Sequence, residues 1–530
     1  MRQICLYHFA IKRQTCLLHY MKASRLLSIE RVVRKGKFSM SNMLPDASAQ
    51  AVRTRASVSK GDGRRSRLML PALLLPVFMA VSNVFIVNVA TPSIQKGLGA
   101  SFADVQFMLT GYTLTFAVLL IIGARLGDRF GRRRMLFIGV ALFTVASLVC
   151  GLSAHVTMLI ASRVLQGVGA ALFMPQVLSL IQANYTPERR GAVFGMYGAT
   201  QGIAATAGQI IGGLLLRMNL WELDWRAVFL ISVLLGALIL ALIPFIPESG
   251  SQDRAGLDWI GAALAAAGLL MLVYPLVQGQ RTGWPAGLIA SLLLSAPMLV
   301  LFAWYERGLL RRGRLPFMNV DLFKNKVFAL GIIVVLLLMS SQGAFFLVAA
   351  YMLQLGLHFS ALQAGLVIGL MGMGYFLASL FSSRVAAKLG AHVLTLGSIL
   401  TTAGYLLLSW AVRTTGVSSD IGVWLPALAV LGIGQGFVAA PLTNIVLAKI
   451  RTADIGSASG VMTTSIQIAS TIGIALIGTV WLSALEAYDG SVSAYSDAFN
   501  ICLYVLAAAA VLILPLALKL AGRNGTGRLG

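Results

Sequence analysis

Apolar residues recur along this 530-residue chain in runs of about 20 residues, separated by short polar gaps. A helix of about 20 apolar residues is long enough to cross the ~30 Å hydrocarbon core of a bilayer. The pattern therefore predicts an all-α integral membrane protein with about fourteen spanning helices. They are expected near 69–90, 104–124, 135–154, 157–182, 191–216, 226–246, 259–278, 286–305, 327–350, 361–382, 391–411, 422–446, 456–482 and 498–520.

The composition supports lipid as the main solvent of the chain. Hydrophobic residues make up 58% and charged residues 11%, against about 25% charged residues in soluble domains. The formal charge of +24 would suit a nucleic-acid-binding protein. However, 15 of the 42 Lys and Arg residues precede residue 68, and most others lie in the polar gaps. We therefore expect contact with anionic lipid headgroups and no nucleic-acid partner.

The distribution of Lys and Arg among the gaps predicts the orientation. Alternate gaps carry 18 basic residues on one side and five on the other. The richer side is cytoplasmic by the positive-inside rule, so both termini are expected inside. Residues 1–67 read as a basic, disordered cytoplasmic segment, in which a true start near Met40 stays open.

An internal repeat indicates the domain organisation. Residues 163–175 match 429–441, and 125–135 match 384–394, at offsets that suit six spans plus two. Parallel repeats of six spans are typical of one large group of transporters. The predicted domains are listed in chain order: a segment 1–67, a six-helix bundle 68–247, an inserted helix pair 248–306, a second six-helix bundle 307–522 and a cytoplasmic tail 523–530.

The gap after the second predicted span carries a motif of glycines and charges. It reads Gly123-Ala-Arg-Leu-Gly-Asp128-Arg129-Phe-Gly131-Arg132-Arg133-Arg134. Gly131 permits a tight turn, Asp128 can cap a helix N-terminus, and the arginines can pair with carboxylates or lipid phosphates. A topology signal alone would explain the arginines, but not the glycines and the aspartate in register. The motif resembles the loop between the second and third helices of the major facilitator superfamily. The resemblance implies a conformational role for Gly123, Asp128, Arg129, Gly131, Arg132 and Arg133.

Other stretches resemble the fourteen-span drug:proton antiporter branch of that superfamily. They are residues 83–92, 106–114, 163–175, 351–354 with 362–365, and the helix-packing motif Gly208-Gln209-Ile-Ile-Gly212-Gly213. The chain departs from the branch at two positions. Asn83 stands in place of an aspartate, and Gln209 stands in place of the proline of Gly-Pro-x-x-Gly-Gly. Both departures weaken the proton antiport that the resemblance implies.

The positions of the acidic residues also weaken the expectation of proton antiport. All 18 Asp and Glu residues fall in the N-terminal segment, in gaps or at span ends, whereas proton relays in transporters normally use intramembrane Asp, Glu or His. If protons are coupled, an edge group such as Asp104 must carry them. Small-residue spacings that include Gly208-x-x-x-Gly212 and Gly456-x-x-x-Gly460 predict close helix contacts.

Arg163 is the one charge predicted well inside a span, where insertion costs roughly 2.5–3.5 kcal/mol. An arginine that snorkels to the outer surface is the alternative interpretation. Counting ~1.5 Å per residue, Asn83 and Arg163 lie at similar depth and are expected to share a hydrogen bond across a central cavity. The other predicted cavity residues are Asn88, Tyr112, Gln166 and Gln209.

The predicted function is secondary efflux of a small amphipathic or cationic organic compound by alternating access, with protons as the coupling ion that the resemblance implies. A proton-uncoupled facilitator or metabolite exporter is the main alternative, and a non-transporting scaffold or sensor is the third. The sequence shows no nucleophile paired with a base, no metal-ligand spacing and no phosphate-binding loop. We therefore expect no enzyme, no cofactor and no primary pump. We expect a monomer in the inner (plasma) membrane.

Overall fold

The computed structural model describes residues 63–523, apart from 220–221, 249–257, 315, 416–420, 448–449, 451–454 and 488–491. The start near Met40 and the tail 524–530 lie outside the described residues. The predicted segment 1–67 is described only from Gly63, where the first helix begins. That helix therefore starts six residues before the predicted span.

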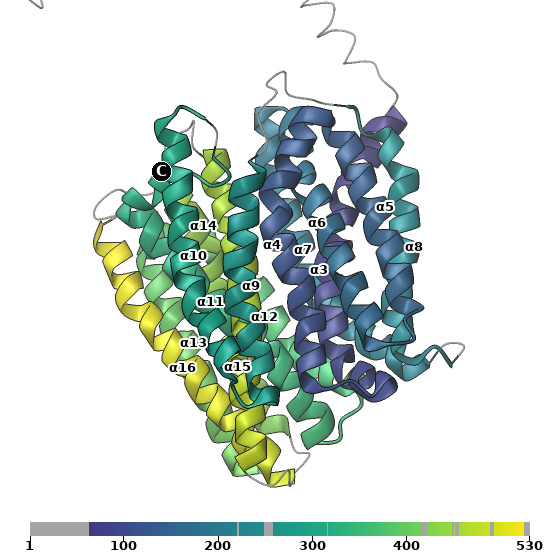
Figure 1. The fold of residues 1–530 in the computed structure, drawn as a ribbon, viewed down its shortest axis with the longest axis vertical. Helices are drawn as coiled ribbons and strands as arrows, with labels where there is room; N and C mark the ends of the chain where they lie inside the picture. Colours follow the sequence, from purple (N-terminus) through teal and green to yellow (C-terminus); the bar gives the residue numbers. More distant parts are fainter. Residues whose placement is uncertain are drawn as a thin grey trace, which may run out of the picture. The chain divides into compact units, whose positions relative to one another are not determined.

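All regular structure in the described residues is helical (Figure 1). Six helices form what we call the N-half: α3 (Gly63–Leu98), α4 (Phe102–Phe130), α5 (Arg132–Gly151), α6 (Val156–Asn184), α7 (Pro187–Met218) and α8 (Ala227–Leu242). Two follow: α9 (Trp259–Thr282) and α10 (Ala286–Arg311). Six form the C-half: α11 (Lys326–Tyr351), α12 (Ala361–Leu389), α13 (His392–Thr415), α14 (Trp424–Leu447), α15 (Ile455–Ala487) and α16 (Val492–Arg523).

Short helical turns link or extend these helices. They are the 3-10 turns η3 (Asp224–Arg226), η4 (Ile243–Phe245), η5 (Val320–Lys324) and η7 (Ile421–Val423), and the π-helical turn η6 (Met352–Gly356). Fourteen helices of the described part are long and apolar enough to cross a membrane, which confirms the predicted count. Several exceed the predicted spans at their ends. For example, α10 runs to Arg311, beyond the predicted end of the inserted segment at residue 306.

The two halves repeat the same packing. In the N-half, α6 packs against α4 and α5, and in the C-half α14 packs against α12 and α13. Gly131 ends α4 with φ +101°, and Gly390 ends α12 with φ +59°. Both are the glycines that the sequence repeat aligned. The repeated segments therefore occupy corresponding places in the two halves.

The halves meet along two pairs of helices, α7 with α12 and α4 with α15. The inserted helix α9 packs against both α4 and α15, so it covers the second of these seams. Figure 1 shows α9 and α10 in front of α15, between the blue N-half and the green-to-yellow C-half. The inserted pair thus touches both halves.

The two ends of the bundle are packed differently. At the end where α3 turns into α4, one apolar core contains residues of both halves, among them Ile86, Phe102, Phe345 and Trp481. At the opposite end, where α4 turns into α5, each half has a separate core. There a Cβ atom added to Gly195 of α7 or Gly460 of α15 would meet no heavy atom within 4 Å. The halves are therefore closed together at the α3–α4 end. Gly460 makes none of the close helix contacts predicted from its spacing, because it lies at the separated end.

Candidate functional site

A buried polar network centres on Arg163 of α6, whose side chain is 1% exposed. Its Nη1 donates to Asn83 Oδ1 and to Gln166 Oε1, each at 2.7 Å. Its Nε donates to the backbone oxygen of Met108 at 3.3 Å. The structure thus shows the predicted hydrogen bond between Asn83 and Arg163, and the guanidinium is held by neutral oxygens.

The network continues toward the outer helices of the N-half. Asn83 Nδ2 donates to Ser232 Oγ of α8 at 3.2 Å, and Gln166 Nε2 donates to Ser147 Oγ of α5 at 2.6 Å. The Tyr112 ring of α4 lies 4.5 Å from the Arg163 guanidinium, a distance at which a cation is attracted to the ring face. Five helices of one half therefore share this network.

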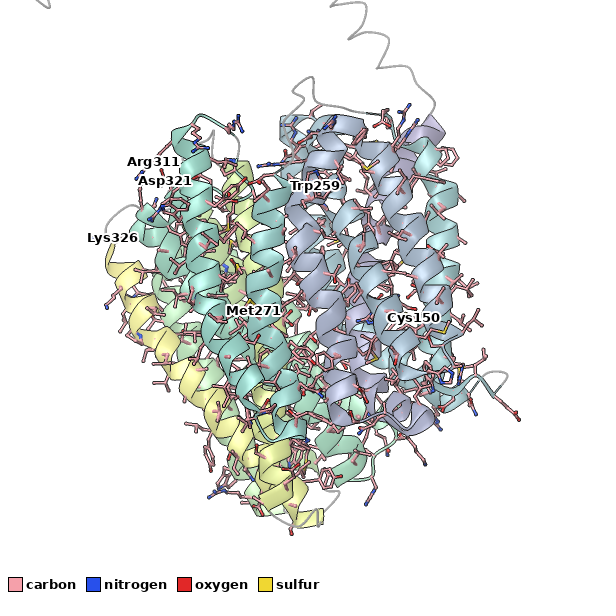
Figure 2. All side chains as sticks on the ribbon, viewed as in Figure 1. Cys150, Trp259, Met271, Arg311, Asp321 and Lys326 are labelled. Atoms are coloured by element: carbon pink, nitrogen blue, oxygen red, sulfur yellow. The ribbon has the colours of Figure 1, made fainter. Side chains whose placement is uncertain are left out.

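The position of the network differs from the expectation. The hydrogen bond was predicted to cross a central cavity, but it joins α3 and α6, and the rest of the network lies on α4, α5 and α8, inside the N-half. Figure 2 labels Cys150, which follows Ser147 by one turn on α5 and is fully buried. Equal depth along two helices could not reveal this, because the rotation of each helix decides which neighbour a side chain meets.

Two predicted cavity residues lie apart from the network and have unpaired polar atoms. Gln209 of α7 is 2% exposed, and neither its Oε1 nor its Nε2 has a hydrogen-bond partner. Asn88 of α3 is 5% exposed, and its Oδ1 is also unpaired. A buried amide without a partner is costly, so each of these atoms is available to a polar group of a bound ligand.

Gln209 lies at the contact between the halves. A Cβ atom added to Gly365 of α12 would overlap the backbone oxygen of Gln209. The neighbouring glycines explain this close approach. Added Cβ atoms at Gly208 and Gly212 would lie 2.9 Å and 3.1 Å from backbone atoms of α3, and one at Gly213 would lie 2.5 Å from a backbone atom of α12. The helix-packing motif therefore places α7 between α3 and the C-half.

The two halves are also joined by polar contacts that the sequence did not single out. Gln106 Nε2 of α4 donates to the backbone oxygen of Ile474 of α15 at 2.9 Å. The hydroxyls of Thr113 and Thr471 lie 2.7 Å apart on the same two helices. Gln106 belongs to a stretch that matched the drug:proton antiporter branch, and that match was the available signal. Thr113 lies in the same stretch, whereas Thr471 carried no signal.

The C-half contains a neutral polar chain of its own. Gln342 Nε2 of α11 donates to Gln435 Oε1 of α14 at 3.1 Å, and Gln435 Nε2 donates to the Tyr405 hydroxyl of α13 at 3.2 Å. The repeat aligns Arg163 with Ala429, and among the residues that the structure describes no Lys or Arg of the C-half is buried. The two halves therefore have different polar interiors.

The loop motif lies at the α4–α5 end. Asp128 Oδ1 accepts from Arg132 Nη2 at 2.8 Å, and the Arg129 guanidinium lies 5.3 Å from the Phe130 ring. An added Cβ atom at Gly123 would overlap the backbone of α6. The expected capping by Asp128 is wrong: it pairs with Arg132 one turn later, and Glu248 instead accepts from the backbone nitrogen of Arg133 at 2.9 Å.

Asp104, the acid at a span end that was predicted as a candidate for proton coupling, caps the start of α4. Its Oδ2 accepts from the backbone nitrogen of Ser101 at 2.9 Å and from the Ser101 hydroxyl at 2.7 Å, which completes a capping box at the start of α4. A carboxylate in a capping box stabilises the first turn of its helix. No group of three His, Cys, Asp or Glu side chains suited to a metal ion occurs in the described part of the chain.

Comparisons with known proteins agree with this architecture. The family model of the Major Facilitator Superfamily matches residues 73–474. A probable actinorhodin transporter of Streptomyces coelicolor is 37% identical, covering 76% of this chain and 70% of its own. A puromycin resistance protein of Streptomyces alboniger is 32% identical, covering 88% and 94%. A bacterial homologue of the human lysosomal transporter Spinster has the same fold, with a TM-score of 0.60, 16% identity and coverage of 87% and 98%.

Proposed function

The chain belongs to the major facilitator superfamily, and from that premise we propose that it exports a small amphipathic or cationic organic compound by alternating access. Relatives that share most of its length are named for antibiotic transport or resistance. Actinorhodin and puromycin are therefore the first compounds to test. We place the α4–α5 end on the cytoplasmic side of a bacterial inner membrane, because the basic gaps lie on that side.

One observation carries the mechanism: the two halves share a single core at the α3–α4 end and have separate cores at the α4–α5 end. Alternating access requires a protein to close one end of a path while the other end is open. The structure suits the state that loads substrate from the cytoplasm. Export follows if the shared core opens and the separate cores meet.

We propose that substrate binds between the halves at Gln209 and Asn88. Both amides are buried with unpaired polar atoms, and Gln209 lies against α12 of the C-half. A ligand that accepts from and donates to Gln209 would supply hydrogen bonds that this amide does not make within the protein. Because one chain supplies both halves of this site, we also propose a monomer as the working unit.

We propose that Arg163 acts in the conformational cycle rather than by touching substrate. Its partners Asn83, Gln166 and Met108, with the serines that Asn83 and Gln166 contact, tie five helices of the N-half together, so the network makes that half move as a rigid unit. Asn83 has no proton to exchange, so proton coupling does not pass through this position. That same asparagine favours the second candidate, a facilitator that runs without protons.

The test is transport into inside-out proteoliposomes that contain the purified chain. Puromycin and actinorhodin are supplied outside, with and without an imposed pH gradient. We expect accumulation of at least one of them above the level of protein-free liposomes, and a lower rate for Gln209→Leu at equal incorporation. Equal accumulation by protein and protein-free liposomes across a panel of cationic and aromatic drugs would contradict the proposal.

A further inference from the structure

Two acids meet in a buried position that the sequence did not reveal. Asp258 comes directly before α9, and Glu306 lies in the last turns of α10, with exposures of 8% and 0%. Apolar side chains of α4, α9 and α10 and the following connection surround them: Ile122, Ala262, Ala265, Phe302 and Phe317. Figure 2 labels Trp259 and Arg311, the neighbouring ends of α9 and α10, at the α4–α5 end.

Three of the four carboxyl oxygens have donors. Asp258 Oδ1 accepts from the Gly261 backbone nitrogen at 2.8 Å and from the Tyr305 hydroxyl at 3.2 Å. Asp258 Oδ2 accepts from the backbone nitrogen of Phe317 at 3.0 Å, and Glu306 Oε2 accepts from that of Met318 at 2.9 Å. Glu306 Oε1 is buried and has no donor.

The unpaired oxygen points at the other acid. A Cβ atom added to Gly261 would overlap both Glu306 Oε1 and Asp258 Oδ2, so the two oxygens crowd the same point. Two carboxylate oxygens are both acceptors, and they form a hydrogen bond only when one of them carries a proton. Buried carboxyls this close together do not both ionise.

The charges around the pair lead to the same conclusion. Arg125 of α4 is the cation that acts on both acids, and the exposed Arg314 lies near Tyr305. Arg125, one shared proton and two carboxyl groups together are neutral. Without the proton the buried group would carry a net negative charge, which is costly in an apolar surrounding.

We propose that Asp258 and Glu306 form a proton-binding site that holds one shared proton in this conformation and exchanges it as the halves move. This rests on the proposed export function, to which it adds the site of proton coupling. The link to movement is the segment 316–318, which leads into the C-half. The acid pair holds Phe317 and Met318, while Arg125 of the N-half donates to the backbone oxygen of Pro316.

Movement of α4 relative to the C-half therefore has two effects. It breaks the contact between Arg125 and Pro316, and it changes the distance between the Arg125 guanidinium and the acid pair. Because a nearby cation favours the ionised form of a carboxyl group, the shared proton is bound more tightly when Arg125 moves away and more weakly when Arg125 lies beside the pair, as in this conformation. The seam between α4 and α15 thus couples proton exchange to the position of the halves.

The first experiment detects the proton itself. Infrared difference spectra of the full-length chain in lipid are recorded over a pH titration, in water and in deuterium oxide. We expect the carbonyl stretching band of a protonated carboxyl at neutral pH, shifted in deuterium oxide and lost at high pH. Glu306→Gln and Asp258→Asn should each remove it, because the new amide donates to the remaining carboxylate. Asp321→Asn, at an exposed acid that pairs with Lys324, is the matched control and should retain it.

The second experiment tests the coupling without any substrate. Spin labels replace the exposed Arg134 of α5 and His392 of α13, which lie within one residue of corresponding positions of the two halves, after the native cysteines are replaced. The distance distribution should change over the pH range in which the band disappears. It should be independent of pH in Glu306→Gln.

Several results would overturn the proposal. They are the absence of the band in the natural chain, its persistence in both amide variants, or a distance distribution that responds to pH equally in Glu306→Gln. None of these readouts depends on export. Failure of puromycin and actinorhodin transport would therefore count against the export function alone.

Discussion

Arg163→Ala removes the donor of two short hydrogen bonds from the interior of the N-half. Asn83 Oδ1 and Gln166 Oε1 each accept from the same Nη1 at 2.7 Å, and all three side chains are at most 1% exposed. A buried acceptor left without a donor costs roughly 1–3 kcal/mol, so two cost about 2–6 kcal/mol. Removing a buried cation also recovers part of its desolvation penalty. We therefore expect a net loss near the lower bound, about 2 kcal/mol.

The matched control replaces the three central side chains with apolar ones of similar size: Asn83→Leu, Arg163→Met and Gln166→Leu together. Here neither amide oxygen is left without a donor, and Ser147 retains its hydrogen bond to the backbone oxygen of Phe143 at 2.7 Å. Replacing buried charged groups by packed apolar ones is often neutral or stabilising. We expect this triple variant to be at least as stable as the natural chain, yet to transport at least tenfold more slowly.

Two measurements separate stability from function. Thermal unfolding of the purified chain in detergent, followed by tryptophan fluorescence, should show a lower midpoint for Arg163→Ala and an unchanged or higher midpoint for the triple variant. Initial transport rates in proteoliposomes should be low for both. An unchanged midpoint for Arg163→Ala would contradict the energetic argument. Normal transport by the triple variant would show that Arg163 has a structural role only.

Three other changes test neighbouring parts of the mechanism. In a Glu306→Gln background, Asn83→Asp should restore a dependence of transport on pH, because a carboxylate facing the buried arginine can gain and lose a proton; a flat pH profile would contradict this. Asp128→Asn removes the half-exposed pair with Arg132, worth at most about 1 kcal/mol, so it should lower turnover several-fold while KM stays within about twofold; a large rise in KM would place Asp128 at the substrate. Gly213→Leu should force α7 away from the backbone of α12 and reduce transport at equal expression; normal transport would show that this close contact is not needed for the cycle.

Hydropathy and charge could predict the fourteen spans and the fold class, because the length of an apolar run reports directly on a helix that crosses lipid. They could also predict a contact between Asn83 and Arg163, since equal depth on two helices of one bundle makes an encounter plausible. The sequence could not predict which neighbouring helices the side chains of Asn83 and Arg163 face. The network faces Ser147 and Ser232 because α5 and α8 pack behind it, and no periodicity in nearly uniform apolar helices reports that rotation.

The buried acid pair was missed for a related reason. Glu306 follows the predicted end of its span by one residue, where an acid is ordinarily exposed to water or headgroups. Its burial depends on the segment 316–318 folding back over α9 and α10, and thus on contacts between residues 12 and 59 positions apart. The missing hydrogen-bond partners of the Gln209 amide depend in the same way on α3 and α12, which are distant in sequence.

The inserted helix pair is fastened to each half at a different end. Near the α3–α4 end, the Thr479 hydroxyl of α15 donates to the backbone oxygen of Leu276 of α9 at 2.7 Å, which joins the pair to the C-half. At the α4–α5 end, the segment held by Asp258 and Glu306 is bonded to Arg125 of the N-half. A rocking motion that separates the halves at one end brings them together at the other, so α9 cannot follow both halves as a rigid rod. One of the two attachments must give way, and only the one at the α4–α5 end contains groups whose charge can change. The proton on the acid pair is therefore suited to decide when that attachment holds.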